Sequence, residues 1–158
     1  PFQVTDVFAK TLETSETVVR ELPESTRDQE RRVVIASTDV HAHALFIIER
    51  GLEAVGLVPV NAGPELAPSE IVELAQAESA AAIVVATYNG MALEVGKALR
   101  RVLDREQLCV PVFMGGRLNQ AVEGEELPVP VSDDLADLGM IPCETIPDLL
   151  CILDDMVV

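Results

Sequence analysis

The sequence predicts an α/β fold in which a five-stranded parallel sheet carries helices on both faces. From residue 31 onward, short apolar runs alternate with longer segments whose apolar residues recur at helical spacing. Residues 80–85 are continuously apolar, which is typical of a parallel strand that is buried on both sides. The chain has 158 residues and is 49% hydrophobic, so it is long and apolar enough to bury one substantial core.

The expected elements alternate regularly along the chain. Strands are expected at residues 32–36, 57–61, 80–85, 110–114 and 139–142. Helices are expected at about residues 44–55, 68–77, 91–103 and 145–156. Gly56 suits a left-handed helix end, Pro68 suits a first helical turn, and Thr145 suits an N-terminal cap. Residues 62–64 are expected to form a turn, residues 117–122 a brief helix, and residues 123–134 an insertion.

Five strands connected in this way fit the flavodoxin-like, Rossmann-type strand order 2-1-3-4-5. Residues 31–158 are expected to form this domain, and residues 1–30 an N-terminal arm and linker. The arm carries a loosely helical apolar stripe, made of Val4, Val7, Phe8 and Leu12. Two interpretations of it stay open: a frayed terminus, or a segment that packs against a partner chain.

The charge of the chain restricts its partners. It has 11 Lys and Arg against 27 Asp and Glu, a net charge of −16, so nucleic-acid and membrane binding are not expected. Cys109, Cys143 and Cys151 share no metal-ligand or redox spacing and are expected to be small core residues in a reducing compartment. No membrane-spanning run or signal peptide is visible, and a cytoplasmic protein is expected.

Both histidines of the chain lie on the loop that follows the first strand, at residues 37–44. Ligands of open α/β sheets bind at the carboxyl ends of strands, so this loop is a candidate site. A neutral imidazole can bind a metal, and a nearby carboxylate such as Asp39 can fix its tautomer by accepting the other ring N–H. The alternative is that Asp39 caps a helix and that His41 and His43 face water.

Three stretches of the chain resemble the cobalamin-binding domain shared by adenosylcobalamin-dependent mutases and corrinoid methyl carriers. The family writes the first loop as D-x-H-x-x-G, and here Asp39 and His41 match while Ala44 replaces the glycine. The family closes the third strand with S-x-[VL], where this chain has Ala86. The family places two glycines after the fourth strand, and Gly115 and Gly116 match them. The resemblance covers roughly residues 31–156.

This resemblance implies a cofactor, cobalamin in its adenosyl form, and a set of binding residues. In the family, the histidine replaces the cofactor's own dimethylbenzimidazole as lower cobalt ligand, a role that falls to His41, and the freed nucleotide tail enters the edge of the sheet. The implied cofactor-binding residues are Thr38, Asp39, His41, Ala42, Ala44, Ala86, Thr87, Tyr88, Gly90, Gly115 and Gly116. Of these, Tyr88 suits packing equally well, and Thr87 could supply the hydroxyl that Ala86 lacks if the strand end twists.

The resemblance also implies a function as the cofactor-binding subunit of a carbon-skeleton mutase, an isomerase that carries out a radical 1,2-rearrangement. The chain offers no constellation for an organic substrate, so a large catalytic barrel subunit is expected as partner, in a heterotetramer. Two alternatives remain: a non-catalytic cobalamin carrier or sensor, and a corrinoid methyl-carrier protein. A zinc hydrolase would need a third ligand beside the two histidines.

Overall fold

In the computed structural model, residue 13 and residues 31–156 are described. The five-stranded parallel sheet has the order β2-β1-β3-β4-β7, which confirms the predicted fold class and strand order. Its strands are β1 (Arg32–Ser37), β2 (Val58–Gly63), β3 (Ala82–Thr87), β4 (Val112–Gly116) and β7 (Ile141–Pro142). The predicted N-terminal arm, residues 1–30, falls outside the described residues apart from Glu13.

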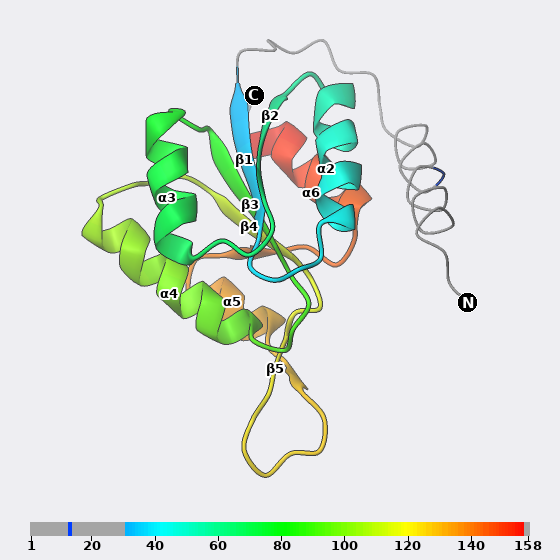
Figure 1. The fold of residues 1–158 in the computed structure, drawn as a ribbon, viewed down its shortest axis with the longest axis vertical. Helices are drawn as coiled ribbons and strands as arrows, with labels where there is room; N and C mark the ends of the chain where they lie inside the picture. Colours follow the sequence, from blue (N-terminus) through cyan, green and yellow to red (C-terminus); the bar gives the residue numbers. More distant parts are fainter. Residues whose placement is uncertain (1–12, 14–30, 157–158) are drawn as a thin grey trace.

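Two helical layers cover the sheet (Figure 1). One face carries α2 (His43–Ala54) and α6 (Ile146–Met156). The other face carries α3 (Pro68–Ala77), α4 (Ala92–Arg105) and α5 (Ser132–Asp137). This layering follows from the alternation of side chains along β1, because Val33 and Ile35 enter the core beneath the first layer and Val34 enters the core beneath the second. All the residues of β3 are buried, as its continuous apolar run predicted.

The helix boundaries agree with the predicted signals. Gly56 has a φ of 79°, so it ends α2 in the left-handed region. The Thr145 hydroxyl accepts a hydrogen bond from the Asp148 N–H at 3.2 Å, which caps α6. In α4, Leu99 and Leu103 are buried while Lys97 is exposed, as the helical spacing of apolar residues predicted.

The segment between β4 and β7 differs from the prediction. Residues 117–122 form no helix; they contain β5 (Asn119–Gln120), which pairs antiparallel with β6 (Val129–Pro130). The expected insertion, residues 123–134, therefore contains the hairpin loop, β6 and the start of α5. The hairpin is tied to the loop before α4, because Ala121 N–H donates to the Gly90 carbonyl, and to the first turn of α4, because Glu94 N–H donates to Gln120 Oε1. These non-local bonds explain why a helix prediction from local sequence failed.

Two smaller differences concern the end of β2 and the cysteines. Residues 62–63 continue β2 instead of turning, and its pairing with β1 is irregular between Ile35 and Ala36. Cys143 is buried, but Cys109 and Cys151 are exposed, so the prediction of three core cysteines was wrong for two of them. Cys151 lies on α6, one residue beyond the buried pair formed by Leu149 and Leu150, and the helical turn carries it outward.

In the part of the chain that the structure describes, no helix is long and apolar enough to cross a membrane.

Candidate functional site

The candidate site forms where β1 and β3 end side by side. Ser37 at the end of β1 is the register partner of Ala86 near the end of β3, and Thr38 N–H donates to the Ala86 carbonyl. The loops that follow the two strands therefore start as neighbours. They diverge toward opposite layers, because β1 leads into α2 and β3 leads into α4. In open α/β sheets this switch point is where ligands bind.

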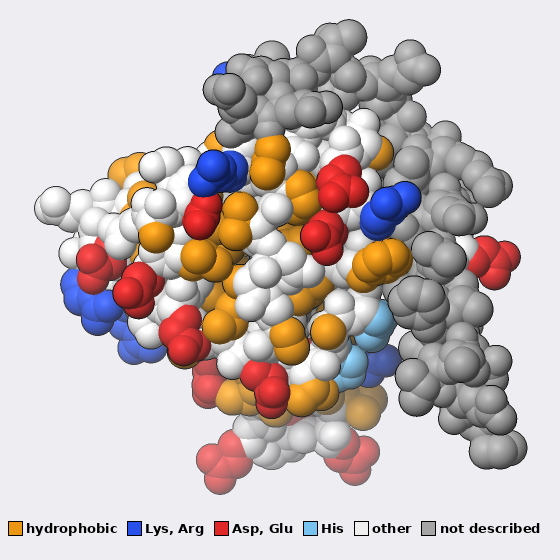
Figure 2. Space-filling model, turned by 45° about the horizontal axis from the view of Figure 1, so that its top comes forward, with side chains coloured by type: hydrophobic (Ala, Val, Ile, Leu, Met, Phe, Trp, Pro, Cys, Tyr) orange, Lys and Arg blue, Asp and Glu red, His pale blue; other side chains and the backbone are white. Residues whose placement is uncertain are grey.

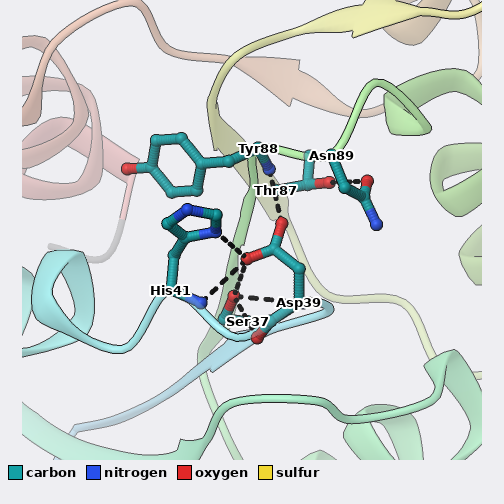
Figure 3. A network of polar contacts seen from close by, with 6 residues as sticks. All are labelled: Ser37, Asp39, His41, Thr87, Tyr88 and Asn89. Atoms are coloured by element: carbon teal, nitrogen blue, oxygen red, sulfur yellow. Dashed lines mark hydrogen bonds and ion pairs between the residues drawn. The ribbon is translucent and has the colours of Figure 1, made fainter.

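Asp39 joins the two loops (Figure 3). Its side chain is only 8% exposed. Its Oδ2 accepts the Tyr88 backbone N–H at 2.6 Å, and its Oδ1 accepts the His41 backbone N–H at 3.0 Å. The Ser37 hydroxyl lies 3.2 Å from the same Oδ1. Burial acts most strongly on the pKa of Asp39 and raises it, but the hydrogen bonds from Tyr88, His41 and Ser37 together outweigh burial, so the pKa lies below its ordinary value.

The carboxylate of Asp39 also orients the imidazole of His41. The distance between His41 Nδ1 and Asp39 Oδ1 is 2.8 Å, so in the neutral ring the proton belongs on Nδ1 and is donated to the carboxylate. This tautomer leaves the lone pair of Nε2 available to a metal ion. The His41 side chain is 44% exposed, so the ring is partly open to solvent.

Three rings gather at this point. The ring centroid of His41 lies 5.1 Å from that of Tyr88 and 6.0 Å from that of His43, the first residue of α2. The imidazoles lie together at the surface of the domain (Figure 2, pale blue). Burial raises the pKa of Tyr88, and the negative charge of Asp39 raises it further, so the phenol stays protonated at neutral pH.

A cavity of about 310 Å³ has Tyr88, one of these three rings, in its wall. It lies between the ends of β3 and β4 and the helices α2 and α6. Its lining residues are Ala44, Ile48, Val84, Val85, Ala86, Tyr88, Phe113, Met114, Gly115, Gly116, Cys143, Glu144, Thr145, Ile146 and Leu149.

Small residues at two strand ends leave room for this cavity. Ala86 on β3 and Gly115 on β4 are register partners, and both line it. A Cβ at Gly115 would meet only the Cys143 carbonyl oxygen, at 3.5 Å, so the glycine leaves open space beside the strand. Gly116 has a φ of 101°, and a Cβ there would collide with the Thr87 carbonyl oxygen, so only glycine fits the chain path at this point.

The structure brings together most of the residues that the sequence singled out. Five of them line the cavity: Ala44, Ala86, Tyr88, Gly115 and Gly116. Four others belong to the loop between β1 and α2: Thr38, Asp39, His41 and Ala42. Gly90 and Thr87 are not in the cavity lining; Gly90 faces the hairpin near Pro128, and the hydroxyl of Thr87 donates to Asn89 Oδ1 at 3.4 Å. Because β3 stays regular through Thr87, that hydroxyl is directed away from Ala86.

Sequence reasoning missed the residues that close the cavity. These are chiefly Ile48, Phe113, Cys143 and Leu149, which come from four different elements or loops. The sequence shows only that these residues are of types common in protein cores, and residues of these types are buried at many positions that line no cavity. It also missed Ser37, whose hydroxyl lies beside Asp39, although its place at the end of a strand could have suggested a role.

The donor set limits which metal site is possible here. Among the residues that the structure describes, no three His, Cys, Asp or Glu side chains come together as ligands. A zinc centre built from this chain's own side chains would require such a group. A metal at His41 would therefore need its other ligands from a bound molecule or another chain.

Comparisons with known proteins give two kinds of similarity. No protein-family model matches the chain. Glutamate mutase sigma subunits 2 and 1 of Haloarcula marismortui are 30% and 31% identical to it over 84 residues, 53% of this chain. The matches span 57% and 56% of those relatives, so the chain matches little more than half of their length.

Several solved structures share the fold. A cobalamin-binding protein from Desulfitobacterium hafniense has a TM-score of 0.67 at 19% identity, over 82% of this chain and 60% of that one. The methanol:cobalamin methyltransferase complex of Methanosarcina barkeri gives 0.67 at 17% identity, over 99% of this chain and 58% of that one. The monomethylamine corrinoid protein of Methanosarcina barkeri gives 0.66 at 17% identity, over 89% and 62%. At these identities the similarity establishes the fold alone.

Proposed function

We propose that this chain binds cobalamin, with His41 as the lower axial ligand of cobalt, and serves as the cofactor-binding subunit of an adenosylcobalamin-dependent carbon-skeleton mutase. The observation that carries the proposal is the pairing of Asp39 with His41 beside a cavity at the switch point of the sheet. The ring of His41 lies 5.1 Å from that of Tyr88, and Tyr88 lines the cavity.

The residues present fit this cofactor. Cobalt in a corrinoid would need one ligand from the protein, and His41 could supply it as a lone imidazole held by a carboxylate. The displaced nucleotide tail would occupy the mostly apolar cavity of about 310 Å³ between α2, α6 and the strand ends. Bound adenosylcobalamin supplies radical chemistry through its cobalt–carbon bond. The residues of this chain hold the cofactor, orient the imidazole through Asp39, and shield the tail from water.

The mutase assignment is supported by the two curated relatives, both named as glutamate mutase sigma subunits. By this proposal the substrate site lies on a separate, larger catalytic chain with a barrel fold, and the two chains form a heterotetramer. The second candidate is a corrinoid methyl carrier or cobalamin sensor; two structures that share the fold are named as a methanol:cobalamin methyltransferase complex and a monomethylamine corrinoid protein. Isomerase activity that appears only when the catalytic chain is added supports the mutase, whereas transfer of a methyl group from the bound cofactor supports the carrier.

Retention of hydroxocobalamin after desalting tests binding itself. The purified chain should keep the red cofactor, and a colourless protein fraction would contradict the proposal.

The role of His41 is tested by electron paramagnetic resonance of the cobalt(II) form, prepared from protein grown on nitrogen-15. A polypeptide ligand gives a two-line nitrogen splitting, while retained benzimidazole gives three lines.

Two variants complete the test. His41→Ala should abolish the two-line signal, because the ring that presents Nε2 is gone. His43→Ala is the matched control, since it removes the other imidazole of the same loop, whose ring centroid lies 6.0 Å away. If the labelled His43→Ala protein loses the two-line signal and His41→Ala keeps it, the cobalt ligand is His43, and the role proposed for His41 is wrong.

A further inference from the structure

The hairpin of β5 and β6 carries apolar side chains beyond the body of the domain. Apolar residues alternate along its two sides, at Leu118 and Val122 and again at Leu127, Val129 and Val131. Leu118, Val129 and Val131 pack in the core cluster beneath α3 and α4. Val122 and Leu127 are 45% and 77% exposed, and the hairpin that bears them projects from the domain (Figure 1). The end of the hairpin therefore presents apolar surface to solvent.

The chain between these two exposed residues is acidic. Glu123, Glu125 and Glu126 are exposed, and none of them takes part in an ion pair within the part of the chain that the structure describes. Pro128 and Pro130 follow on the second side of the hairpin, and a proline has no N–H to donate to an added strand. The hairpin is thus suited to a contact through its side chains, with carboxylates beside an apolar pair, and not to the addition of a strand.

Helix α4 carries the complementary charge. Four of the eight Lys and Arg among the described residues lie on it, although the chain as a whole is strongly acidic. Lys97, Arg101 and Arg105 are exposed and recur every four residues, so they form a basic stripe along one side of the helix. Among the described residues, Lys97 and Arg101 take part in no ion pair. Ala98 and Val102 are half-buried next to these two cations, so the stripe has an apolar border.

Within one copy of the chain, the end of the hairpin and the basic stripe stay apart. No ion pair joins them in the described part of the chain, and the hairpin points away from the C-terminal half of α4 (Figure 1). They nevertheless belong to neighbouring parts of one surface, because Gln120 at the base of the hairpin accepts the Glu94 N–H in the first turn of α4. A surface that holds both halves of a contact can meet its own copy across a two-fold axis.

We infer that this chain forms a two-fold dimer in which the hairpin end of each copy rests on the basic stripe of the other. Val122 and Leu127 then lose water against the apolar border of the stripe, and the three glutamates of the hairpin meet the three cations of the stripe. None of these residues lines the cavity near His41. The inference therefore goes beyond the proposed function and does not depend on it.

The net charge of −16 opposes this association, because two copies repel each other. At about 0.15 M salt the Debye length is about 8 Å, so repulsion between distant carboxylates is largely screened while groups in contact still attract. Exposed ion pairs contribute little individually, so the apolar pair supplies most of the affinity and the charges determine which surfaces meet. We expect a weak dimer, with a dissociation constant on the order of 10 μM.

Sedimentation velocity of the full chain tests the association, at concentrations from about 1 μM to about 200 μM in about 0.15 M sodium chloride. The sedimentation coefficient should rise from that of a monomer to that of a dimer over this range. A chain that stays monomeric throughout would overturn the inference.

The apolar part of the contact is tested by Leu127→Asp. This change should weaken the dimer roughly 10- to 100-fold, because it places a charge at the centre of the contact. The Leu127 side chain is 77% exposed, so the fold of each copy does not depend on it, and circular dichroism checks this. Met156→Asp is the matched control, since Met156 is 51% exposed on α6 in the opposite layer and the change adds the same charge. A Leu127→Asp protein that dimerises as tightly as the Met156→Asp control would overturn the inference.

Charge reversal tests whether the hairpin and the stripe meet each other. The hairpin variant combines Glu123→Lys, Glu125→Lys and Glu126→Lys, and the helix variant combines Lys97→Glu, Arg101→Glu and Arg105→Glu. Each should weaken the dimer roughly 10-fold, although the hairpin variant lowers the net negative charge and would tighten a dimer governed by net charge alone. Both sets in one chain should restore the wild-type dissociation constant to within about threefold. A hairpin variant that associates more tightly than wild type, or a combined variant as weak as its two parents, would overturn the inference.

Discussion

The carboxylate of Asp39 holds two loops and one imidazole at the same time. Each of its oxygens already accepts a backbone N–H, one from His41 and one from Tyr88. An amide in its place would turn an NH₂ group toward one of these donors. Asp39→Asn should therefore weaken cobalamin binding by roughly 10- to 100-fold, as losses of such supporting groups do. Dissociation constants measured by absorbance titration check this, with the exposed Asp137→Asn as control.

Asp39 should also contribute to stability in a pH-dependent way. Its pKa in the folded chain is below the ordinary value, because the hydrogen bonds to the carboxylate outweigh the opposing effect of burial. The charged form therefore stabilises the fold at pH values above the unfolded pKa, and this contribution is lost as the pH falls through the folded pKa. Urea unfolding of wild type and Asp39→Asn should give a large difference in free energy at pH 7 and a smaller one at pH 3. A difference that grows toward acid would contradict this sign.

The three cysteines should differ in reactivity. Burial raises the pKa of Cys143 to about 11, with a further contribution from the negative charge of Asp148, so its thiol is neutral at pH 8. Cys109 and Cys151 are exposed. A thiol reagent at pH 8 should label Cys109 and Cys151 quickly and Cys143 slowly, and peptide mapping identifies the labelled sites. Fast labelling of Cys143 would show that the cavity wall opens readily.

At the scale of elements, the hairpin of β5 and β6 supports α4 as well as itself. The Glu94 N–H lies in the first turn of α4, where backbone donors have no carbonyl partner within the helix. Gln120 Oε1 accepts this N–H at 3.1 Å. Gln120→Ala should cost about 1 kcal/mol of unfolding free energy, the usual loss for a helix cap. Gln76→Ala, on an exposed face of α3, is the control and should cost less. Equal losses in the two variants would argue against the cap.

The same hairpin marks the limit of prediction from sequence. The strands β1 and β3 could be predicted because their apolar runs must be buried on both faces, whatever the rest of the chain does. Gln120 carries no local sign that it will cap a helix that begins 28 residues earlier, so the short helix expected there was wrong. The pairing of Asp39 with His41 was predictable from two residues in one loop, whereas Cys143 and Ile48 meet only through the fold.

For the whole molecule, the dominant feature is its net charge of −16. Acidic side chains are scattered over the face drawn in Figure 2. Mutual repulsion between them destabilises the compact state, and dissolved salt screens it. The urea midpoint of unfolding should therefore rise when sodium chloride is raised from about 0.05 M to about 1 M, where the Debye length falls to roughly 3 Å. A midpoint that stays constant or falls would mean that attractive surface pairs outweigh the repulsion.

The bond from the Tyr88 N–H to Asp39 spans 49 residues of sequence. Its two ends approach each other only after β1 and β3 have paired, because Ser37 and Ala86 are then neighbours. The carboxylate that orients His41 is thus anchored across the sheet only once this pairing has overcome the loop-closure entropy. If the chain binds cobalamin as proposed, the cofactor meets this anchored site in the native state alone. Cofactor binding should then raise the free energy of unfolding.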